Sequence, residues 1–243
     1  MELEEGFRRS IDICSFVQYT VHMAATAAKI ANVLSHLRED ARLRETVPRE
    51  DRRLSSGVSS LDVALQGGLP RGRVLELSGP RSSGRLSMAV QLLSAAAARG
   101  EWTALIDVSD AFDPRSASLL MMDRLLWVRP RMTFDGFKVA DLILDAGGFG
   151  LVVLYLCEHP QRERLDWTAL ALRLKHRAER SQAAVLLVTD VPRAGSVALA
   201  GRIHTRSGAY RWRGGLLEKR ESEITVEIKH AVSEVPLAFD LSE

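Results

Sequence analysis

A glycine-bounded turn between a strand and a helix constrains the fold of this chain more than any other segment. Residues 74–78 (VLELS) form a short apolar run that predicts a strand, and residues 87–98 (SMAVQLLSAAAA) predict a helix that stops at Gly100. Between them lies the sequence GPRSSGRLS, residues 79–87, with four residues between its two glycines. This spacing matches a phosphate-binding loop, whose backbone N–H groups wrap phosphates at the start of a helix.

The rest of the chain continues this alternation of strands and helices. Apolar runs without alternation are expected for strands that are buried on both faces of a parallel sheet. Residues 196–239 change to short alternating segments with glycine turns, which predict an antiparallel edge. We therefore predict a three-layer α/β/α core with a mostly parallel sheet and an antiparallel C-terminal edge. Further strands are predicted at 103–108, 127–128, 151–156 and 184–189, and helices at 116–126, 137–147 and 167–180.

The first fifty residues differ from the rest. Residues 24–44 have a helical pattern, and Pro48 begins a polar linker. We predict a helical N-terminal extension and linker over residues 1–50 and a core domain over residues 51–243. The apolar stripe of this helix includes Ile30, Leu34 and Leu37. It is either a partner surface or a face that packs onto its own domain.

Composition excludes several classes of protein. Charge is balanced, with 33 Lys+Arg against 31 Asp+Glu, so no global nucleic-acid signature is present. Two cysteines, Cys14 and Cys157, are too few for a disulfide scaffold, and no apolar run is long enough to cross a membrane, so we expect a cytoplasmic protein. The histidines show no metal spacing, so no metal site is predicted. Asp107, Asp110 and Asp113 follow a strand, but a turn explains them better than a cation site does.

Two positions of the loop lack the residues that nucleotide chemistry needs. A working loop has lysine after the second glycine and then Ser or Thr to ligate Mg²⁺, where this chain has Arg85 and Leu86. Leucine cannot ligate a metal, and the planar guanidinium replaces a compact ammonium poorly. No lysine lies between Lys29 and Lys138, so none nearby along the chain stands in. We therefore expect no hydrolysis and no cofactor, although weak nucleotide binding stays open. The degenerate nucleotide-binding loop comprises Gly79, Pro80, Arg81, Ser82, Ser83, Gly84, Arg85, Leu86 and Ser87.

The order of motifs resembles the RecA family of recombinases over about residues 54–240. Residues 54–62 (LSSGVSSLD) and 67–74 (GGLPRGRV) are similar to the family's approach to the phosphate loop. Residues 79–87 are similar to its G-P-E-S-S-G-K-T-T, and residues 105–114 (LIDVSDAFDP) to its F-I-D-A-E-H-A-L-D-P. The resemblance implies a RecA-like fold. It also implies that an N-terminal helix packs on a neighbouring protomer, so an exposed stripe would be a partner surface of a homo-oligomer, and the two readings of this stripe stay equal.

The same resemblance implies that the catalytic positions are lost. The family's loop lysine falls at Arg85 and its magnesium-binding threonine at Leu86. The glutamate that polarises water falls at Ser109, the Walker B aspartate at Tyr155 and the sensor glutamine at Asp190. Phosphoryl transfer relies on all of these parts together, so a pseudo-ATPase is expected. The DNA-binding loops also look shortened.

One stretch with no catalytic purpose points to a subfamily. Residues 127–130 (WVRP) and 138–154 (KVADLILDAGGFGLVVL) are similar to the ImuA group of RecA-like proteins. This resemblance implies a scaffold in the SOS response and translesion synthesis, associated with the nucleoid when DNA is damaged. The implied partners are the polymerase-like protein ImuB, an error-prone replicative-type polymerase and RecA.

A basic and aromatic segment is a candidate contact for single-stranded DNA, although an arginine-rich solvent face is the commoner explanation. The segment contains Arg202, Arg206, Tyr210, Arg211, Trp212 and Arg213.

Two other functions stay open. One is a divergent DNA-dependent RecA-family ATPase that uses Arg85 and Ser87. The other is an inhibitory binding module like the cell-division inhibitor SulA.

Overall fold

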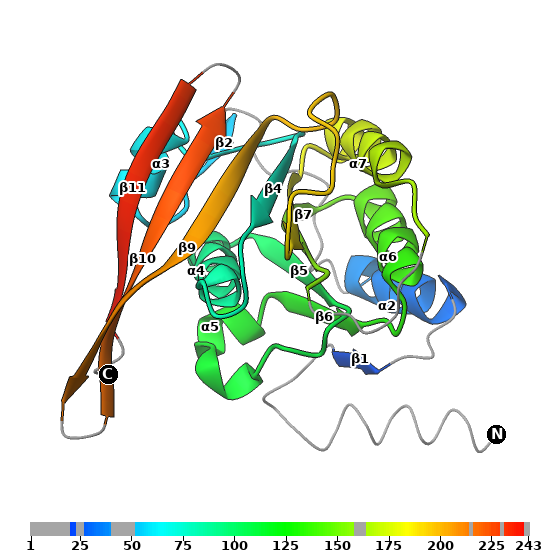
Figure 1. Cartoon of the computed structure of the whole chain (residues 1–243). Helices are drawn as coiled ribbons and strands as arrows, with labels where there is room; N and C mark the ends of the chain where they lie inside the picture. The colour runs from blue at the N-terminus through cyan, green and yellow to red at the C-terminus, as the bar shows by residue number, and fades with distance from the viewer. Residues whose placement is uncertain are drawn as a thin grey trace.

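The computed structural model describes residues 20–22, 27–39, 52–157, 164–213, 216–228 and 231–240 (Figure 1). Its helices include one 3₁₀ turn, at Pro114–Ser116. The α-helices are α2 (Ala27–Glu39), α3 (Ser59–Ala64), α4 (Arg85–Ala98), α5 (Leu119–Met122), α6 (Thr133–Ala146) and α7 (Trp167–Ser181). The strands are β1 (Thr20–His22), β2 (Arg53–Leu54), β3 (Leu69–Pro70), β4 (Val74–Ser78), β5 (Trp102–Asp107), β6 (Leu125–Arg129), β7 (Phe149–Tyr155), β8 (Ala184–Thr189), β9 (Gly201–Arg213), β10 (Leu216–Ile228) and β11 (Ala231–Asp240).

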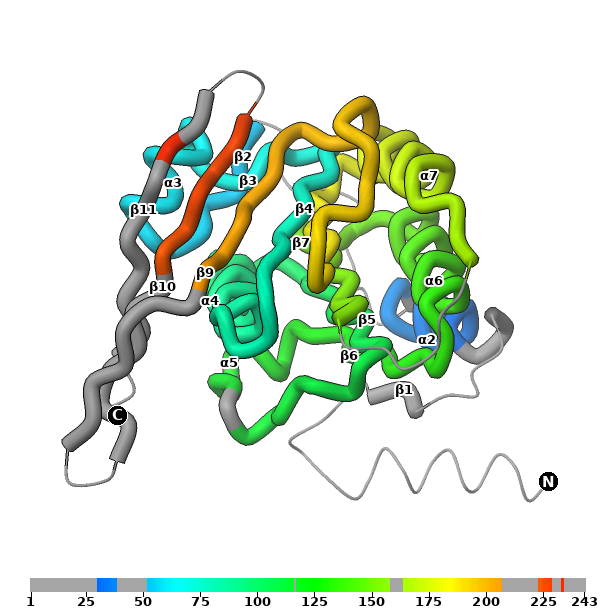
Figure 2. The backbone as a smooth tube through the Cα atoms, viewed as in Figure 1, coloured from blue at the N-terminus to red at the C-terminus, as the bar shows by residue number. Residues whose placement is uncertain are grey.

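Nine of these strands form one sheet in the order β1-β6-β5-β7-β8-β4-β9-β10-β11. Within this sheet, all neighbouring strands from β1 across to β9 are parallel, whereas β9–β10 and β10–β11 are antiparallel. Helices α2, α6 and α7 cover one face, and α4 and α5 cover the other (Figure 2). The predicted fold class, a mostly parallel α/β sheet with an antiparallel C-terminal edge, is confirmed.

Strand β7 shows why the central strands lack alternation. Leu151 and Val153 pack into the core on the α4 side, whereas Val152 and Leu154 pack into the core on the α6 side. Both sets are buried, so an apolar residue is needed at each position. The predicted strands at 74–78 and 184–189 match β4 and β8 at both ends.

The N-terminal stripe packs onto its own domain. Ile30, Leu34 and Leu37 are 1%, 5% and 0% exposed and belong to the same core cluster as residues of α6. Strand β1 also joins the main sheet, through parallel pairing with β6. The partner-surface prediction for these three residues is therefore wrong, because the open face of α6 offers their apolar side chains an intramolecular partner.

The helix predicted at 116–126 is also wrong in extent. Only Leu119–Met122 are α-helical, and the Ser118 hydroxyl accepts a hydrogen bond from the Met121 N–H at their start. The chain then turns into β6, where Leu125 is paired with Thr103 of β5. Sheet pairing thus overrides helical periodicity at these residues.

Within the ranges given above, no helix is long and apolar enough to cross a membrane. The same residues hold no group of three or more His, Cys, Asp and Glu side chains placed to bind a metal ion.

Candidate functional site

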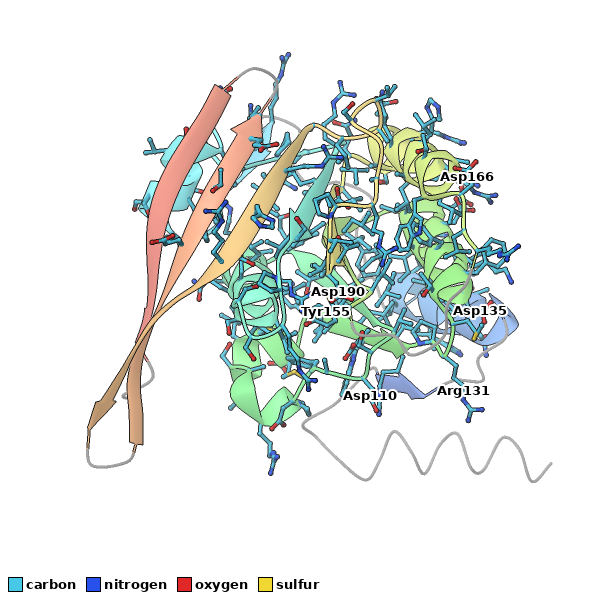
Figure 3. The ribbon with its side chains drawn as sticks, in the orientation of Figure 1. Asp110, Arg131, Asp135, Tyr155, Asp166 and Asp190 are labelled. Carbon is cyan, nitrogen blue, oxygen red and sulfur yellow. The ribbon has the colours of Figure 1, made fainter. Side chains whose placement is uncertain are left out.

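The candidate site lies where three parallel strands end at one edge of the sheet. Strands β7, β8 and β4 are neighbours in that order, so the residues after their carboxyl ends are brought together. Tyr155 ends β7, Asp190 follows β8, and Gly79 follows β4. Figure 3 shows Tyr155 and Asp190 close together at this edge. Ligands of open α/β sheets bind at such edges.

The turn from Gly79 to Gly84 has the backbone of a tight strand-to-helix connection. Gly84 has φ +95° and immediately precedes the first residue of α4, a conformation that favours glycine. The Ser83 N–H donates to the Pro80 carbonyl at 3.2 Å, and the Met88 N–H donates to the Gly84 carbonyl at 2.8 Å. The tip of the turn is exposed, whereas Ser83, Gly84 and Arg85 at its base are buried.

The Arg85 side chain turns to the end of the neighbouring strand. Its Nη1 atom donates to the Asp190 carboxylate at 2.6 Å and to the Thr189 carbonyl at 3.1 Å. Its side chain is 2% exposed. Burial lowers the pKa of this guanidinium, but the hydrogen bond to Asp190 and the nearby Cys157, Tyr155 and Asp190 raise it by more. Arg85 is therefore a buried cation with a carboxylate partner.

The next two residues leave no magnesium ligand in the usual place. Leu86 is half-buried and packs against the core cluster of α4 and α5. It has no oxygen to offer a hard cation, which takes oxygen ligands. Ser87 is exposed, one position later on α4. The side chains at this loop therefore do not fit a magnesium-bound nucleotide.

Strand β9 closes against the start of the turn. The hydroxyls of Ser83 and Thr205 are 2.6 Å apart, and the Thr205 hydroxyl donates to the Ser78 carbonyl at 3.3 Å. A Cβ on Gly79 would collide with Thr205 and with the Ser83 hydroxyl. Glycine is thus required at position 79 by close packing against β9.

A buried glutamate that sequence reasoning missed organises the neighbouring segment. Glu76 lies in β4 with no exposed surface and accepts from the Thr189 hydroxyl. It also accepts from the backbone N–H groups of Arg193 and Ala194 at 2.7 and 3.1 Å. Its other oxygen accepts from Arg202 Nε at 3.0 Å. The signal in the sequence is an acidic residue inside an apolar strand, since a buried carboxylate requires partners.

Comparisons with known proteins point to one type of α/β fold. Residues 41–158 match the model of the RecA N-terminal domain. The crystal structure of the RadB recombinase superposes with a TM-score of 0.60 and 18% sequence identity, over 78% of this chain and 96% of that one. The chain has the RecA fold.

Curated relatives match over part of their length. Protein RecA of Streptococcus pyogenes serotype M49 is 37% identical over 116 residues, which cover 46% of this chain and 31% of the relative. Protein RecA of Streptococcus gordonii is 35% identical over 132 residues, covering 51% and 34%. The chain thus spans about a third of the length of these relatives. Together the matches support a RecA-like family.

The other two positions that the sequence resemblance assigns to catalytic residues have local structural partners. The Ser109 hydroxyl donates to the Cys157 carbonyl. Tyr155 is buried and is paired across the sheet with Asp107, whose Oδ2 accepts from the Phe112 N–H at 2.9 Å. The RecA fold therefore brings Arg85, Tyr155 and Asp190 to one edge, as their positions in the resemblance imply.

The structure describes the side chains of two candidate DNA-contact residues of this RecA fold. Arg202 is bound to Glu76 and to the Ala194 carbonyl, which gives it a structural role, whereas Arg206 is exposed. DNA contact stays a prediction for the segment. The other members, Tyr210, Arg211, Trp212 and Arg213, lie on β9, and their side chains are outside the described part of the chain.

Proposed function

We propose that this chain is a RecA-fold scaffold that does not hydrolyse ATP and that acts in DNA-damage-induced translesion synthesis. The observation that carries the proposal is the ion pair between Arg85 and Asp190. Both residues stand at positions that the resemblance assigns to nucleotide chemistry, and here they bind each other.

The side chains at the edge of the sheet support the proposed loss of hydrolysis. Phosphoryl transfer depends on positioning and on charge stabilisation of the phosphate, the metal and the attacking water. Leu86 supplies no metal ligand, and the Ser109 hydroxyl is held by the Cys157 carbonyl. In the resemblance, the Walker B carboxylate falls near Tyr155. Nucleotide binding is a separate property and is weak in this proposal.

The translesion role is supported by the stretch that resembles the ImuA group. Residues 127–130 and 138–154 span the end of β6, most of α6 and most of β7. The proposed partners are the polymerase-like ImuB, an error-prone replicative-type polymerase and RecA, and single-stranded DNA is a possible ligand. In this proposal the fold contributes surfaces instead of turnover.

An ATPase assay tests the loss of hydrolysis. The wild-type chain and the Arg85→Ala variant are compared with and without magnesium and single-stranded DNA. We expect both to show the same background rate. Magnesium-dependent turnover by the wild type that Arg85→Ala abolishes would overturn this part. It would favour the second candidate, a divergent ATPase, for which the exposed Ser87 hydroxyl at the start of α4 is the supporting observation.

Co-purification and a mutagenesis assay test the scaffold role. The tagged chain should retain the polymerase-like partner, and a strain without the chain should show fewer damage-induced mutations. We expect Ser87→Ala, at an exposed position of the loop, to restore both properties as well as the wild type does, because the loop chemistry is not used. Recovery of a tubulin-like partner instead of a polymerase would contradict the proposal and favour a SulA-like inhibitor.

A further inference from the structure

The ion pair of Arg85 is asymmetric in its exposure to solvent. The Arg85 side chain is 2% exposed, whereas the Asp190 side chain is 38% exposed. The cation therefore lies inside the protein, and its counter-ion lies at the surface. Asp190 follows a strand adjacent to β4, so the carboxylate that reaches Arg85 comes from a residue 105 positions further along the chain.

We propose that Asp190 is an internal plug, a carboxylate that occupies the place at Arg85 which a phosphate-bearing anion would otherwise take. Without the Asp190 carboxylate, the turn after β4 becomes a site where a dissolved anion pairs with Arg85. The inference rests on the proposed loss of hydrolysis, since a plug that left for each turnover would belong to an active ATPase. It adds an autoinhibitory contact to that proposal.

Hydrogen bonds hold both sides of the contact in place. On the Asp190 side, Glu76 accepts hydrogen bonds from the Thr189 hydroxyl and from the N–H groups of Arg193 and Ala194. On the Arg85 side, the Ser83 hydroxyl is hydrogen-bonded to Thr205. The Asp190 carboxylate is therefore kept beside Arg85 at a high effective concentration, and a dissolved anion competes with it poorly.

Removal of the Asp190 carboxylate should destabilise the folded state, because Arg85 is a buried cation. Truncating one partner of a buried ion pair leaves the other charge without its counter-ion, which is strongly destabilising. In Asp190→Ala, Arg85 keeps its hydrogen bond to the Thr189 carbonyl but loses the carboxylate. A multivalent anion that enters from the exposed side replaces that charge, and ligands that bind the native state raise the melting temperature.

Rescue by inorganic pyrophosphate tests the plug. The melting temperatures of the wild type and of Asp190→Ala are measured over a pyrophosphate series at constant ionic strength. We expect the variant to melt lower by about 5 °C or more without pyrophosphate, and to recover about 3–6 °C at ten times its dissociation constant. The wild type should change by less than about 2 °C, and its apparent affinity for pyrophosphate should be about tenfold weaker or more.

Three further variants keep the test decisive. Asp145→Ala removes an exposed aspartate that also pairs with an arginine, Arg177 of α7, and should show no rescue. The double variant Arg85→Met/Asp190→Ala should lose the rescue, because the buried cation is gone. Asp190→Asn, which keeps the shape of the side chain, is titrated with pyrophosphate by calorimetry if Asp190→Ala does not fold.

Two kinds of outcome would overturn the plug without contradicting the proposed function. Equal stabilisation of the wild type and Asp190→Ala, or rescue that persists without Arg85, overturns it. Absence of binding to both Asp190 variants also overturns it. An ATPase-active wild type would instead contradict the proposed function, so the two failures are distinguishable.

Discussion

The Ser83 hydroxyl lies 2.6 Å from the Thr205 hydroxyl, which ties the turn after β4 to β9 across 122 positions of the chain. Both residues are buried, so the pair has little access to water. The same Thr205 hydroxyl also donates to the Ser78 carbonyl. The base of the turn is thus fixed by a strand that belongs to the antiparallel edge.

Thr205→Val should destabilise the protein by about 1–3 kcal/mol, because it removes the partner of a buried hydroxyl while keeping the shape of the side chain. The free energy of unfolding in urea measures the effect. Thr168→Val, at an exposed position of α7, is the matched control and should change stability by less than about 0.5 kcal/mol. Equal effects of the two substitutions would show that the Ser83–Thr205 contact contributes nothing.

Glu76→Gln should destabilise the protein by about 2–3 kcal/mol. The substitution keeps the volume but leaves the half-buried Arg202 without its carboxylate, and it weakens the bonds to the Arg193 and Ala194 N–H groups. Urea unfolding measures this change. Glu179→Gln breaks an exposed pair with Arg73 and should cost less than about 1 kcal/mol. A Glu76→Gln effect as small as that of the control would contradict the anchoring role.

Gly150→Ala should cost about 1–3 kcal/mol or more, because a Cβ at this position collides with the Glu101 carboxylate. Glu101 makes a buried, bidentate ion pair with Arg71, with N–O distances of 2.9 and 2.5 Å. Gly150 is therefore explained by packing at the edge of the sheet where the parallel strands begin.

A double-mutant cycle checks this explanation. Once Glu101→Ala has removed the carboxylate, adding Gly150→Ala should cost clearly less than it does in the wild type. Additive costs would show that the collision with Glu101 is not the cause.

Asp107→Asn should change how stability depends on pH. Burial raises the pKa of Asp107 above its ordinary value of 3.8, the charge of Asp110 raises it further, and the Phe112 and Ala111 N–H groups and Arg129 lower it by less. The folded state therefore holds the proton more tightly than the unfolded state does. The stability contributed by this proton is present below the ordinary pKa and is lost as the pH rises through the folded pKa.

The measurement is the free energy of unfolding of wild type and variant from pH 4 upward. Asparagine does not ionise in this range, so the stability of Asp107→Asn relative to the wild type should increase as the pH rises. An increase of the wild type over the variant with pH would contradict the direction of the Asp107 pKa.

Much of the fold and one half of the site could be predicted from local sequence. Apolar runs at 74–78 and 184–189 match β4 and β8, because a strand buried on both faces needs apolar residues throughout. The glycine-bounded turn lies between β4 and α4, as its sequence predicts. Leu86 lacks an oxygen ligand wherever its side chain lies, so that prediction required no structure.

The rest depended on contacts between distant segments. The helix predicted at 116–126 is shortened because Leu125 is paired with β5, and the N-terminal stripe is buried because α6 lies opposite it. The partners of Arg85 and Glu76 come from residues more than a hundred positions away. No local pattern specifies which distant charge a buried charge will meet.

The sequence by itself determined which chemical groups this RecA fold possesses: an arginine without a neighbouring lysine, a leucine in place of a metal ligand, and strands apolar enough for a parallel sheet. Only the tertiary structure decided that Arg85 pairs with Asp190 and that Thr205 closes against Gly79. The physical reason is that side-chain chemistry is local, whereas the pairing of buried charges is set by the order in which strands lie side by side.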